Sequence, residues 1–182
     1  MINLKNKLGG ERGWAPPFRY HGEQCCIDFL NNVQTLLRRF LSYNGFSVGI
    51  SDCIPKNKVD AKLKDTVFSS ESDAIIQLSN EMNEIGEQVQ RALPNTNRFK
   101  IMIAAGSKGS TTNITQISGI VGQQLINGKR INDDLVDRTM SCFQKYDMSA
   151  ASKGYVSGNY IYGLNPIEFF FHTAGGREGL TE

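Results

Sequence analysis

The sequence predicts a mainly α-helical protein with short β elements. Two long stretches repeat apolar residues at intervals of three and four, which is the period of one helix face. A further helix near the C-terminal end carries a cap and a proline at its start. The glycine-rich segments between the helices favour only short strands and turns. A chain of 182 residues fits one domain or one and a half, and is long enough to bury a core.

The first part of the chain predicts an irregular lead-in, residues 1–27, followed by a helix. Glycines and prolines up to about Gly22 predict irregular or extended backbone. The apolar spacing from about Cys26 to Tyr43 predicts a helix, with Arg38 and Arg39 mostly off its apolar stripe. Asn44-Gly45 then has the form that ends a helix.

The next segments predict a short strand, a loop and a second long helix. Phe46–Ile50 alternates apolar and small residues, as a strand does. The lysines of 55–66 are more typical of a solvated loop or helix face than of a binding patch. A helix begins near Ser70-x-x-Asp73, a capping box with Asp in place of Glu. Its apolar positions are Ile75, Leu78, Met82, Ile85 and Val89, its predicted solvent-facing positions are Glu81, Glu84 and Glu87, and Pro94 lies past its end.

The middle of the chain predicts a short helix with a small-residue face. Residues 98–105 are apolar on one side and lead into a glycine-rich segment, after which 111–113 offer helix N-caps. We expect Thr115, Gly119 and Gly122 to let another backbone approach closely, and Gln123-Gln124 to end this helix. Asn127-Gly128 is a tight-turn signal. The apolar stripe of this helix is Ile114, Ile117 and Val121.

The last helix has the most unusual sequence. Asn165 is its expected cap, with Pro166 in the first turn and Glu168 three residues after the cap. Phe at 169–171 presents apolar surface nearly all round, so we expect the helix to be enclosed. Each glycine of Gly175-Gly176 costs roughly 1 kcal/mol relative to alanine, which predicts close approach of another chain or a bending point.

Composition narrows the class of function. The net charge of +2 carries no general nucleic-acid or membrane signal, and no apolar run is long enough to span a bilayer. The spacing of the cysteines does not suit zinc, so we expect reduced thiols and no metal site. The four cysteines are Cys25, Cys26, Cys53 and Cys142.

Three groups of polar residues invite a chemical interpretation. Around Lys108 the glycines are misplaced for a phosphate loop, and an interhelical turn is the simpler interpretation. Residues 123–130 place two carboxamides and two cations around a turn. They could bind a polar ligand or a neighbouring backbone, or simply satisfy a buried turn. His172 lacks a positioned nucleophile, as a structural histidine does, and no residue set supports autonomous catalysis.

Three blocks of sequence carry a family resemblance. They are Ala105-Gly106-Ser107-Lys108-Gly109-Ser110 with Asn113-Ile114, Val121-Gly122-Gln123-Gln124 with Gly128-Lys129-Arg130, and Gly163-Leu164 through Pro166-x-Glu168-Phe169-Phe170-Phe171-His172 to Gly175-Gly176-Arg177-Glu178-Gly179-Leu180. Together they resemble the largest subunit of multisubunit DNA-directed RNA polymerases, in its eukaryotic or large-DNA-virus form. The resemblance covers most of the chain from about residue 28.

The resemblance implies a fold and a role. It implies a funnel-type helical domain over 28–130, followed over 131–182 by the start of the cleft region and a truncated bridge helix. The funnel lines the secondary channel through which nucleotides enter. Lys108 would lie near the nucleotide path, and Gly175 and Gly176 would be the bridge-helix hinge. The residues that would line the channel and the amatoxin pocket are Gln123, Gln124, Gly128, Lys129, Arg130, Tyr160, His172 and Glu178.

The resemblance also implies what the chain works with. We expect it to support templated RNA synthesis only in an assembled polymerase, with the rest of the largest subunit, the second-largest subunit, other polymerase subunits, DNA, RNA and a transcript-cleavage factor, and with no membrane. The magnesium-binding aspartates and the trigger loop lie outside these residues, so no cofactor is expected here and Mg²⁺ belongs to the assembled enzyme. The expected location is the nucleus or cytoplasm, or a viral factory or virion.

Departures from the family pattern leave alternatives open. Leu125 and Asn127 replace residues that are usual in the nuclear enzyme, which puts amatoxin sensitivity in doubt. The divergence of the sequence from the nuclear subunits favours a viral or otherwise divergent source. The main alternative function is a non-catalytic interaction or regulatory module derived from this region. An independent nucleotide-binding enzyme built around Lys108 is a third.

Overall fold

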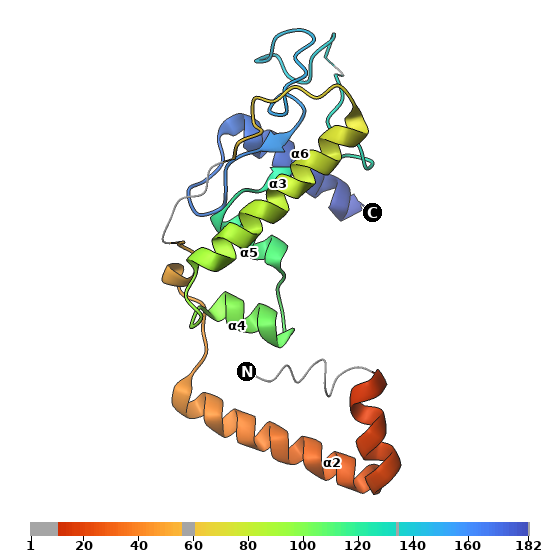
Figure 1. The fold of residues 1–182 in the computed structure, drawn as a ribbon, viewed down its shortest axis with the longest axis vertical. Coiled ribbons are helices and arrows are strands. Elements are labelled where there is room, and N and C mark those ends of the chain that lie inside the picture. The colour runs from red at the N-terminus through yellow and green to blue at the C-terminus, as the bar shows by residue number, and fades with distance from the viewer. Residues whose placement is uncertain (1–10, 56–60, 134, 182) are drawn as a thin grey trace. The chain divides into compact units, whose positions relative to one another are not determined.

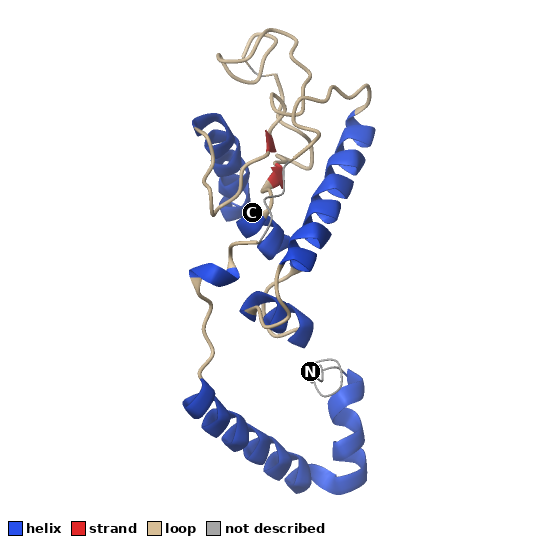
Figure 2. Cartoon of the chain, turned by 60° about the vertical axis from the view of Figure 1, so that its left-hand side comes forward, coloured by secondary structure: helices blue, strands red, loops and turns tan. Residues whose placement is uncertain are grey.

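The computed structural model describes residues 11–55, 61–133 and 135–181, and is mainly helical with one small antiparallel sheet (Figures 1 and 2). The predicted fold class is therefore confirmed. The chain forms two compact units, which we call unit one (Met1–Asp52 with Pro94–Ser110) and unit two (Cys53–Leu93 with Thr111–Glu182). The division into 1–27, 28–130 and 131–182 that the resemblance implies stays a prediction.

Unit one begins with the helix α2 (Glu11–Asn44), which is broken at Gly22. Gly22 has φ 80° and ψ 170°, so two helical pieces meet there. The prediction of irregular backbone is therefore wrong from residue 11 onward, because the break is confined to one glycine. The predicted end at Asn44 is confirmed, since Gly45 takes the left-handed conformation and donates to the Leu41 carbonyl at 2.8 Å.

The other helical elements in the described part of unit one are η1 (Ile50–Asp52) and α4 (Arg98–Ala105). The predicted strand at 46–50 is wrong, because Asp52 closes a turn there instead. Its carboxylate accepts from the Gly49 amide at 3.0 Å and from the Arg98 amide at 3.1 Å. These two backbone amides, Gly49 first, hold the pKa of Asp52 below its usual value. The turn thus ties residue 52 to the start of α4.

In unit two, α3 (Glu71–Ala92) packs directly on α5 (Thr111–Ser118). A Cβ at Gly86 would lie 2.6 Å from the Thr115 hydroxyl oxygen, and one at Gly119 would lie 2.8 Å from an Ile85 methyl carbon. Only residues without a side chain permit so close a contact. The predicted small-residue face is therefore confirmed for Thr115 and Gly119, and its partner is α3.

One carboxylate of α3 lies on the opposite side from that predicted. Glu81 is buried, not solvent-facing, and accepts from the backbone amides of Lys62 and Leu63 and from the Tyr155 hydroxyl. The helical period explains the error, because Glu81 follows the buried Leu78 by three positions. Burial, followed by the bond to Glu81, raises the pKa of the Tyr155 phenol.

Helix α3 begins at the position that the sequence predicted, but its N-cap residue does not make the predicted hydrogen bonds. Ser70 is the N-cap residue with extended backbone, so the predicted position is confirmed. Its side chain makes no capping bond, because its hydroxyl oxygen lies 2.9 Å from that of Ser72 instead. The predicted capping box is therefore wrong as a hydrogen-bond pattern.

The sheet of unit two pairs β1 (Gly122–Gln123) with β2 (Tyr155–Val156). The prediction that Gln123-Gln124 ends a helix is wrong, because α5 ends at Ser118 and Gly122, with φ 88°, leads into a strand. The Asn127-Gly128 turn is confirmed. Both residues have positive φ, 50° and 71°, and the flanking Ile126 and Lys129 exchange backbone hydrogen bonds of 2.9 and 3.0 Å.

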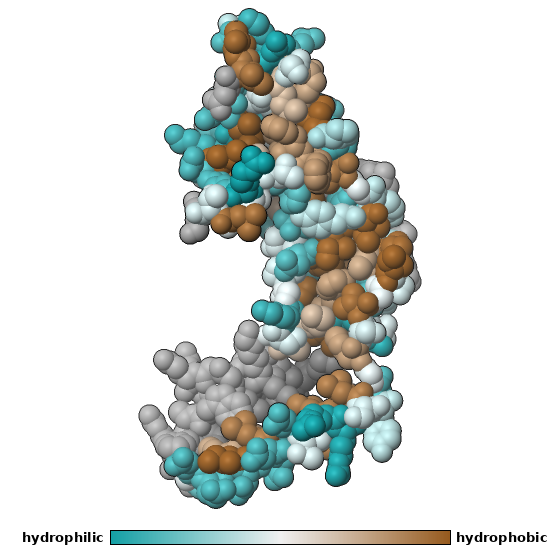
Figure 3. Space-filling model, turned by 180° about the vertical axis from the view of Figure 1, so that it is seen from behind, coloured by the Kyte–Doolittle hydropathy of each residue, from teal (hydrophilic) through white to brown (hydrophobic). Residues whose placement is uncertain are grey.

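The last helix, α6 (Pro166–Thr181), begins with the expected capping box. The Glu168 amide donates to the Asn165 side-chain oxygen at 2.8 Å, and the Asn165 amide donates to the Glu168 carboxylate at 3.1 Å. The expected enclosure is only partial: Phe171 is 1% exposed, whereas Phe169 and Phe170 are 59% and 55% exposed. Apolar side chains reach the surface in several places on the face drawn in Figure 3.

None of the helices in the described ranges combines the length and the hydropathy that a membrane span requires.

Candidate functional site

The start of α6 is held by a single buried carboxylate. Glu168 is 7% exposed and accepts from the Ser157 amide at 2.9 Å, the Ser157 hydroxyl at 2.8 Å and the Gly158 amide at 3.1 Å. Burial by itself would raise the pKa of Glu168, but these bonds and the one from the Asn165 amide lower it overall. The charged carboxylate thus joins α6 to the loop after β2.

One turn further on, His172 joins α6 to two other segments. Its Nδ1 lies 3.3 Å from Gln124 Oε1, and its Nε2 lies 3.4 Å from the Tyr160 hydroxyl. The Gln124 amide nitrogen donates to the Gly122 carbonyl at 3.1 Å, which orients its oxygen toward the imidazole. A carbonyl oxygen only accepts, so this arrangement favours a proton on Nδ1 and donation from Tyr160 to Nε2.

The same face of α6 continues over Gly175 and Glu178. A Cβ at Gly175 would lie 3.3 Å from Gln124 Oε1 and 3.6 Å from the Leu125 carbonyl, whereas one at Gly176 would meet nothing within 4 Å. The Glu178 carboxylate accepts from the Asn127 amide. We call Gln124, Tyr160, His172, Gly175 and Glu178 the His172 cluster. Positions 168, 172, 175 and 178 form one helical stripe, which meets the loop after β2 at Glu168 and the segment 124–127 after β1 at the other three positions.

The structure therefore brings together five of the residues that the family resemblance selected. Asn127 completes the contact through its backbone amide, and Ser157 fixes the helix start. Sequence reasoning missed both of these roles. The capping pattern pointed to Glu168, but no local signal pointed to Ser157, because the two residues are separated by a loop.

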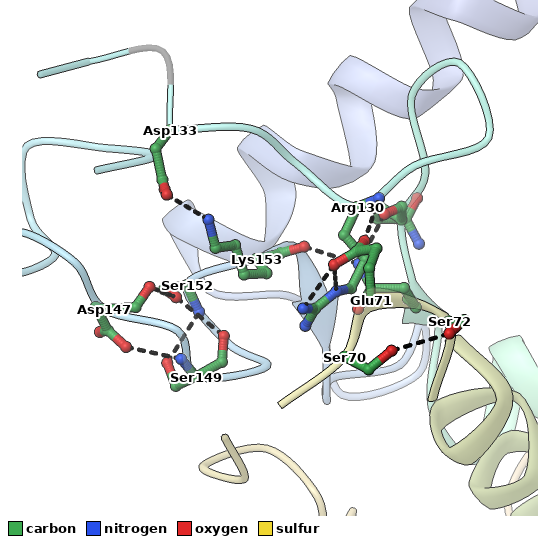
Figure 4. Close-up of polar contacts among 11 residues, drawn as sticks. Ser70, Glu71, Ser72, Arg130, Asp133, Asp147, Ser149, Ser152 and Lys153 are labelled. Atoms are coloured by element: carbon green, nitrogen blue, oxygen red, sulfur yellow. Dashed lines mark hydrogen bonds and ion pairs between the residues drawn. The ribbon is translucent and has the colours of Figure 1, made fainter. Parts of the chain in front are cut away.

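Other selected residues have contacts typical of a buried turn. The side-chain amide nitrogen of Gln123 donates to the backbone carbonyls of Gln124 and Lys153 at 2.7 and 2.8 Å. Arg130 is 4% exposed and pairs with Glu71, its Nε at 2.9 Å from the carboxylate (Figure 4). Hydrogen bonding from Arg130 lowers the pKa of Glu71. These contacts support the interpretation that Gln123 and Arg130 hold a buried turn together, and among the described residues Gln123 Oε1 and Arg130 Nη1 are buried there without a hydrogen-bond partner.

A second ion pair lies beside that turn. Lys153 Nζ is 2.6 Å from an Asp133 carboxylate oxygen, and the Lys153 side chain is 8% exposed (Figure 4). The Lys153 backbone carbonyl accepts from both Gln123 and the Ile131 amide, the latter at 3.3 Å. The segment 129–131 is thereby fixed to the segment before β2.

The remaining selected residues are exposed. Gly128 lies in the tight turn, and Lys129 follows it. Lys108 belongs to unit one and is exposed in the segment after α4. Gly176 lies on an open side of α6. Their functional roles stay predictions.

The chemistry of the His172 cluster is that of a polar contact. An amide oxygen, an imidazole and a phenol can hold a helix in register and can exchange hydrogen bonds with a polar ligand. Across the described ranges, His, Cys, Asp and Glu side chains form no group of three that could hold a metal ion. The absence of a cofactor site in the chain stays a prediction.

Comparison with known proteins identifies the family. A family model described as "RNA polymerase Rpb1, domain 4" matches residues 50–156, which include α3, α5 and both strands. The chain is 33% identical over 192 aligned residues to DNA-directed RNA polymerase III subunit RPC1 of Saccharomyces cerevisiae, and equally to that of Debaryomyces hansenii. These alignments cover 90% of this chain and 13% of either relative.

The chain therefore belongs to the family of RNA polymerase largest subunits, and it corresponds to a fragment of such a subunit. The predicted family is confirmed. The family model ends before α6, whereas the alignments to the two yeast subunits cover nearly the whole chain.

Proposed function

We propose that this chain lines the channel through which nucleotides reach the active centre of a multisubunit RNA polymerase, and that α6 forms the first turns of its bridge helix. The observation that carries the proposal is the packing of α6 on the segment 124–127 after β1 through the His172 cluster. The family membership supports it, because templated RNA synthesis is what the names of the yeast relatives state.

The contacts of α6 support a bending role for its glycines. Before Gly175 the helix is held by Glu168, His172 and the buried Phe171. After Gly176, the described hydrogen bond that joins α6 to another segment runs from the Asn127 amide to the Glu178 carboxylate. A helix fixed at one end and lightly held at the other bends where helix propensity is lowest, and that is at the glycine pair.

The wider assignments follow from the same proposal. The partners would be the rest of the largest subunit, the second-largest subunit and the other polymerase subunits, with DNA template, RNA and a transcript-cleavage factor bound by the assembly. Mg²⁺ would be held elsewhere in the assembled enzyme, and Lys108 would lie near the nucleotide path. The location would be the nucleus or the cytoplasm, or a viral factory or virion for a viral source.

Affinity purification from the source organism tests the proposal. A tag on the full chain should recover a second large polymerase subunit together with template-dependent incorporation of labelled nucleotides. An untagged extract provides the background. Recovery of the chain alone, without RNA synthesis, would overturn the proposal and favour an interaction module.

Variants in the purified assembly test the His172 cluster. His172→Ala removes both ring nitrogens that meet Gln124 and Tyr160, so we expect slower elongation on a defined template. Thr173→Ala is the matched control, because Thr173 is exposed and its hydroxyl bonds only the Phe170 carbonyl of its own helix. Equal elongation rates for the two variants would count against a role for the cluster.

A further inference from the structure

The polar side of α2 carries an open hollow of about 330 Å³. Among the residues that the structure describes, its lining consists of Thr35, Arg38, Arg39 and Ser42. These positions are related as i, i+3, i+4 and i+7, so a single helical face presents all four. The volume lies at the lower end of the range of pockets that hold small molecules.

The two arginines of the hollow have no acidic partner in the described part of the chain. Arg91 and Arg130 make ion pairs of 2.7 and 2.8 Å with carboxylates, whereas Arg38 and Arg39 make none there. Asp28, seven positions before Thr35, is hydrogen-bonded to Gln24 at 3.0 Å. The hollow therefore presents two positive charges. A guanidinium pairs bidentately with phosphate oxygens, which makes arginine the preferred residue for that contact.

The hydroxyl groups of Thr35 and Ser42 differ in whether their proton is available to a ligand. Ser42 already donates its proton to the Arg38 carbonyl at 2.8 Å. Thr35 makes no hydrogen bond with another described side chain, so its proton can reach a ligand oxygen. A serine hydroxyl has a single proton to donate. Thr35 therefore adds a donor to the two guanidinium groups, and Ser42 contributes only shape.

An aromatic ring lies beside the hollow. Tyr43 is 90% exposed and follows Arg39 by four positions, so the two side chains are neighbours on the helix surface. Cationic side chains next to an exposed aromatic ring are the combination with which proteins hold single strands, the cations on phosphates and the ring on a base.

We propose that this face of α2 binds single-stranded RNA. Arg38 and Arg39 contact a phosphate, Thr35 donates to one of its oxygens, and Tyr43 stacks on the neighbouring base. The proposal is argued from α2 alone and does not rest on the function proposed above.

Fluorescence anisotropy with the full chain and a labelled ten-nucleotide RNA tests this site. The double variant Arg38→Gln/Arg39→Gln should weaken binding by about tenfold or more, since it removes both guanidinium groups that contact the phosphate. The slope of log affinity against log salt should become about one unit shallower. Arg91→Gln is the matched control, because Arg91 is an exposed arginine paired with Glu87. Circular dichroism confirms that all variants keep their helices.

Two further measurements test base stacking and strand recognition separately. Tyr43→Ala should weaken RNA binding by about fivefold or more, because it removes the ring on which a base stacks. Inorganic triphosphate should displace the RNA only at much higher concentration than unlabelled RNA does. Equal displacement by both would overturn strand recognition in favour of a simple phosphate site, and equal affinity of the wild type and the double arginine variant would overturn the site altogether.

Discussion

Two helix contacts of unit two are built in opposite ways. The contact of α3 with α5 depends on close approach, with no side chain at Gly86, which faces Thr111 and Thr115, or at Gly119, which faces Ile85 and Val89. The contact of α6 with the rest of the unit depends on polar groups, with Glu168 and His172 on one stripe and Phe171 as its buried apolar anchor. The first contact resists sliding. The second depends on a few hydrogen bonds besides the Phe171 anchor, which suits the bending that we propose for α6.

The largest expected effect tests the apolar anchor of α6. Phe171→Ala removes a side chain that is 1% exposed, and should lower the free energy of unfolding by about 3–5 kcal/mol. Phe170→Ala is the matched control, because that ring is 55% exposed. Urea unfolding monitored by circular dichroism measures both. Equal losses would show that Phe171 is not the anchor.

The second prediction tests the polar side of the same contact. Glu168→Gln removes the charge that accepts bonds from Ser157, Gly158 and Asn165, and should cost about 1.5–3 kcal/mol at pH 7.

The pH dependence of that cost follows from the sign of the pKa shift. Folding lowers the pKa of Glu168 from its ordinary 4.5, so its contribution is complete above that value and is lost as the pH falls toward the lower folded pKa. The wild type should therefore lose more stability between pH 7 and pH 3 than Glu168→Gln does. Parallel losses, measured by thermal unfolding, would contradict the role of this carboxylate.

A third prediction tests the close approach of α3 to α5. Gly86→Ala places a Cβ 2.6 Å from the Thr115 hydroxyl oxygen, and should cost about 1–3 kcal/mol by overpacking. Thr115→Ala in the same chain should restore part of that loss, because it removes the oxygen that the new methyl group meets. A double-mutant cycle with additive costs would show that the two positions do not meet.

The smallest expected effect compares the two glycines of α6. Gly176→Ala meets nothing within 4 Å, and should stabilise the helix by about 1 kcal/mol through its higher helix propensity. Gly175→Ala gains the same propensity but places a methyl group 3.3 Å from Gln124 Oε1, so its net gain should be smaller. Thermal unfolding separates them. In an assembled polymerase, both should stiffen the proposed hinge.

Much of the fold could be read from the sequence, because helix ends carry local signals. The cap at Asn165, the stop at Asn44-Gly45 and the turn at Asn127-Gly128 each act within four residues. The errors occur where local patterns are ambiguous. Residues 46–50 alternate like a strand, yet Asp52 closes a turn with Gly49. The stretch 119–124 continues a helical pattern, yet Gly122 leads into β1.

The candidate site was predictable only in part. The family resemblance selected Gln124, Tyr160, His172, Gly175 and Glu178, and the structure places them together. The contribution of Ser157 could not be predicted, because it depends on how the loop after β2 meets α6.

By itself, the sequence determined where α3 and α6 begin, the cap at Asn165, the stop at Asn44-Gly45, the tight turn at Asn127-Gly128 and the family, because these depend on neighbouring residues or on long matched blocks. Tertiary structure alone decided that Glu81 is buried while Glu84 is exposed, and that Phe171 is enclosed while Phe170 reaches the surface. Within each pair the two residues are of the same type and lie no more than three positions apart in the sequence. The difference comes from which segment packs over each side chain, and such contacts join residues far apart in the sequence.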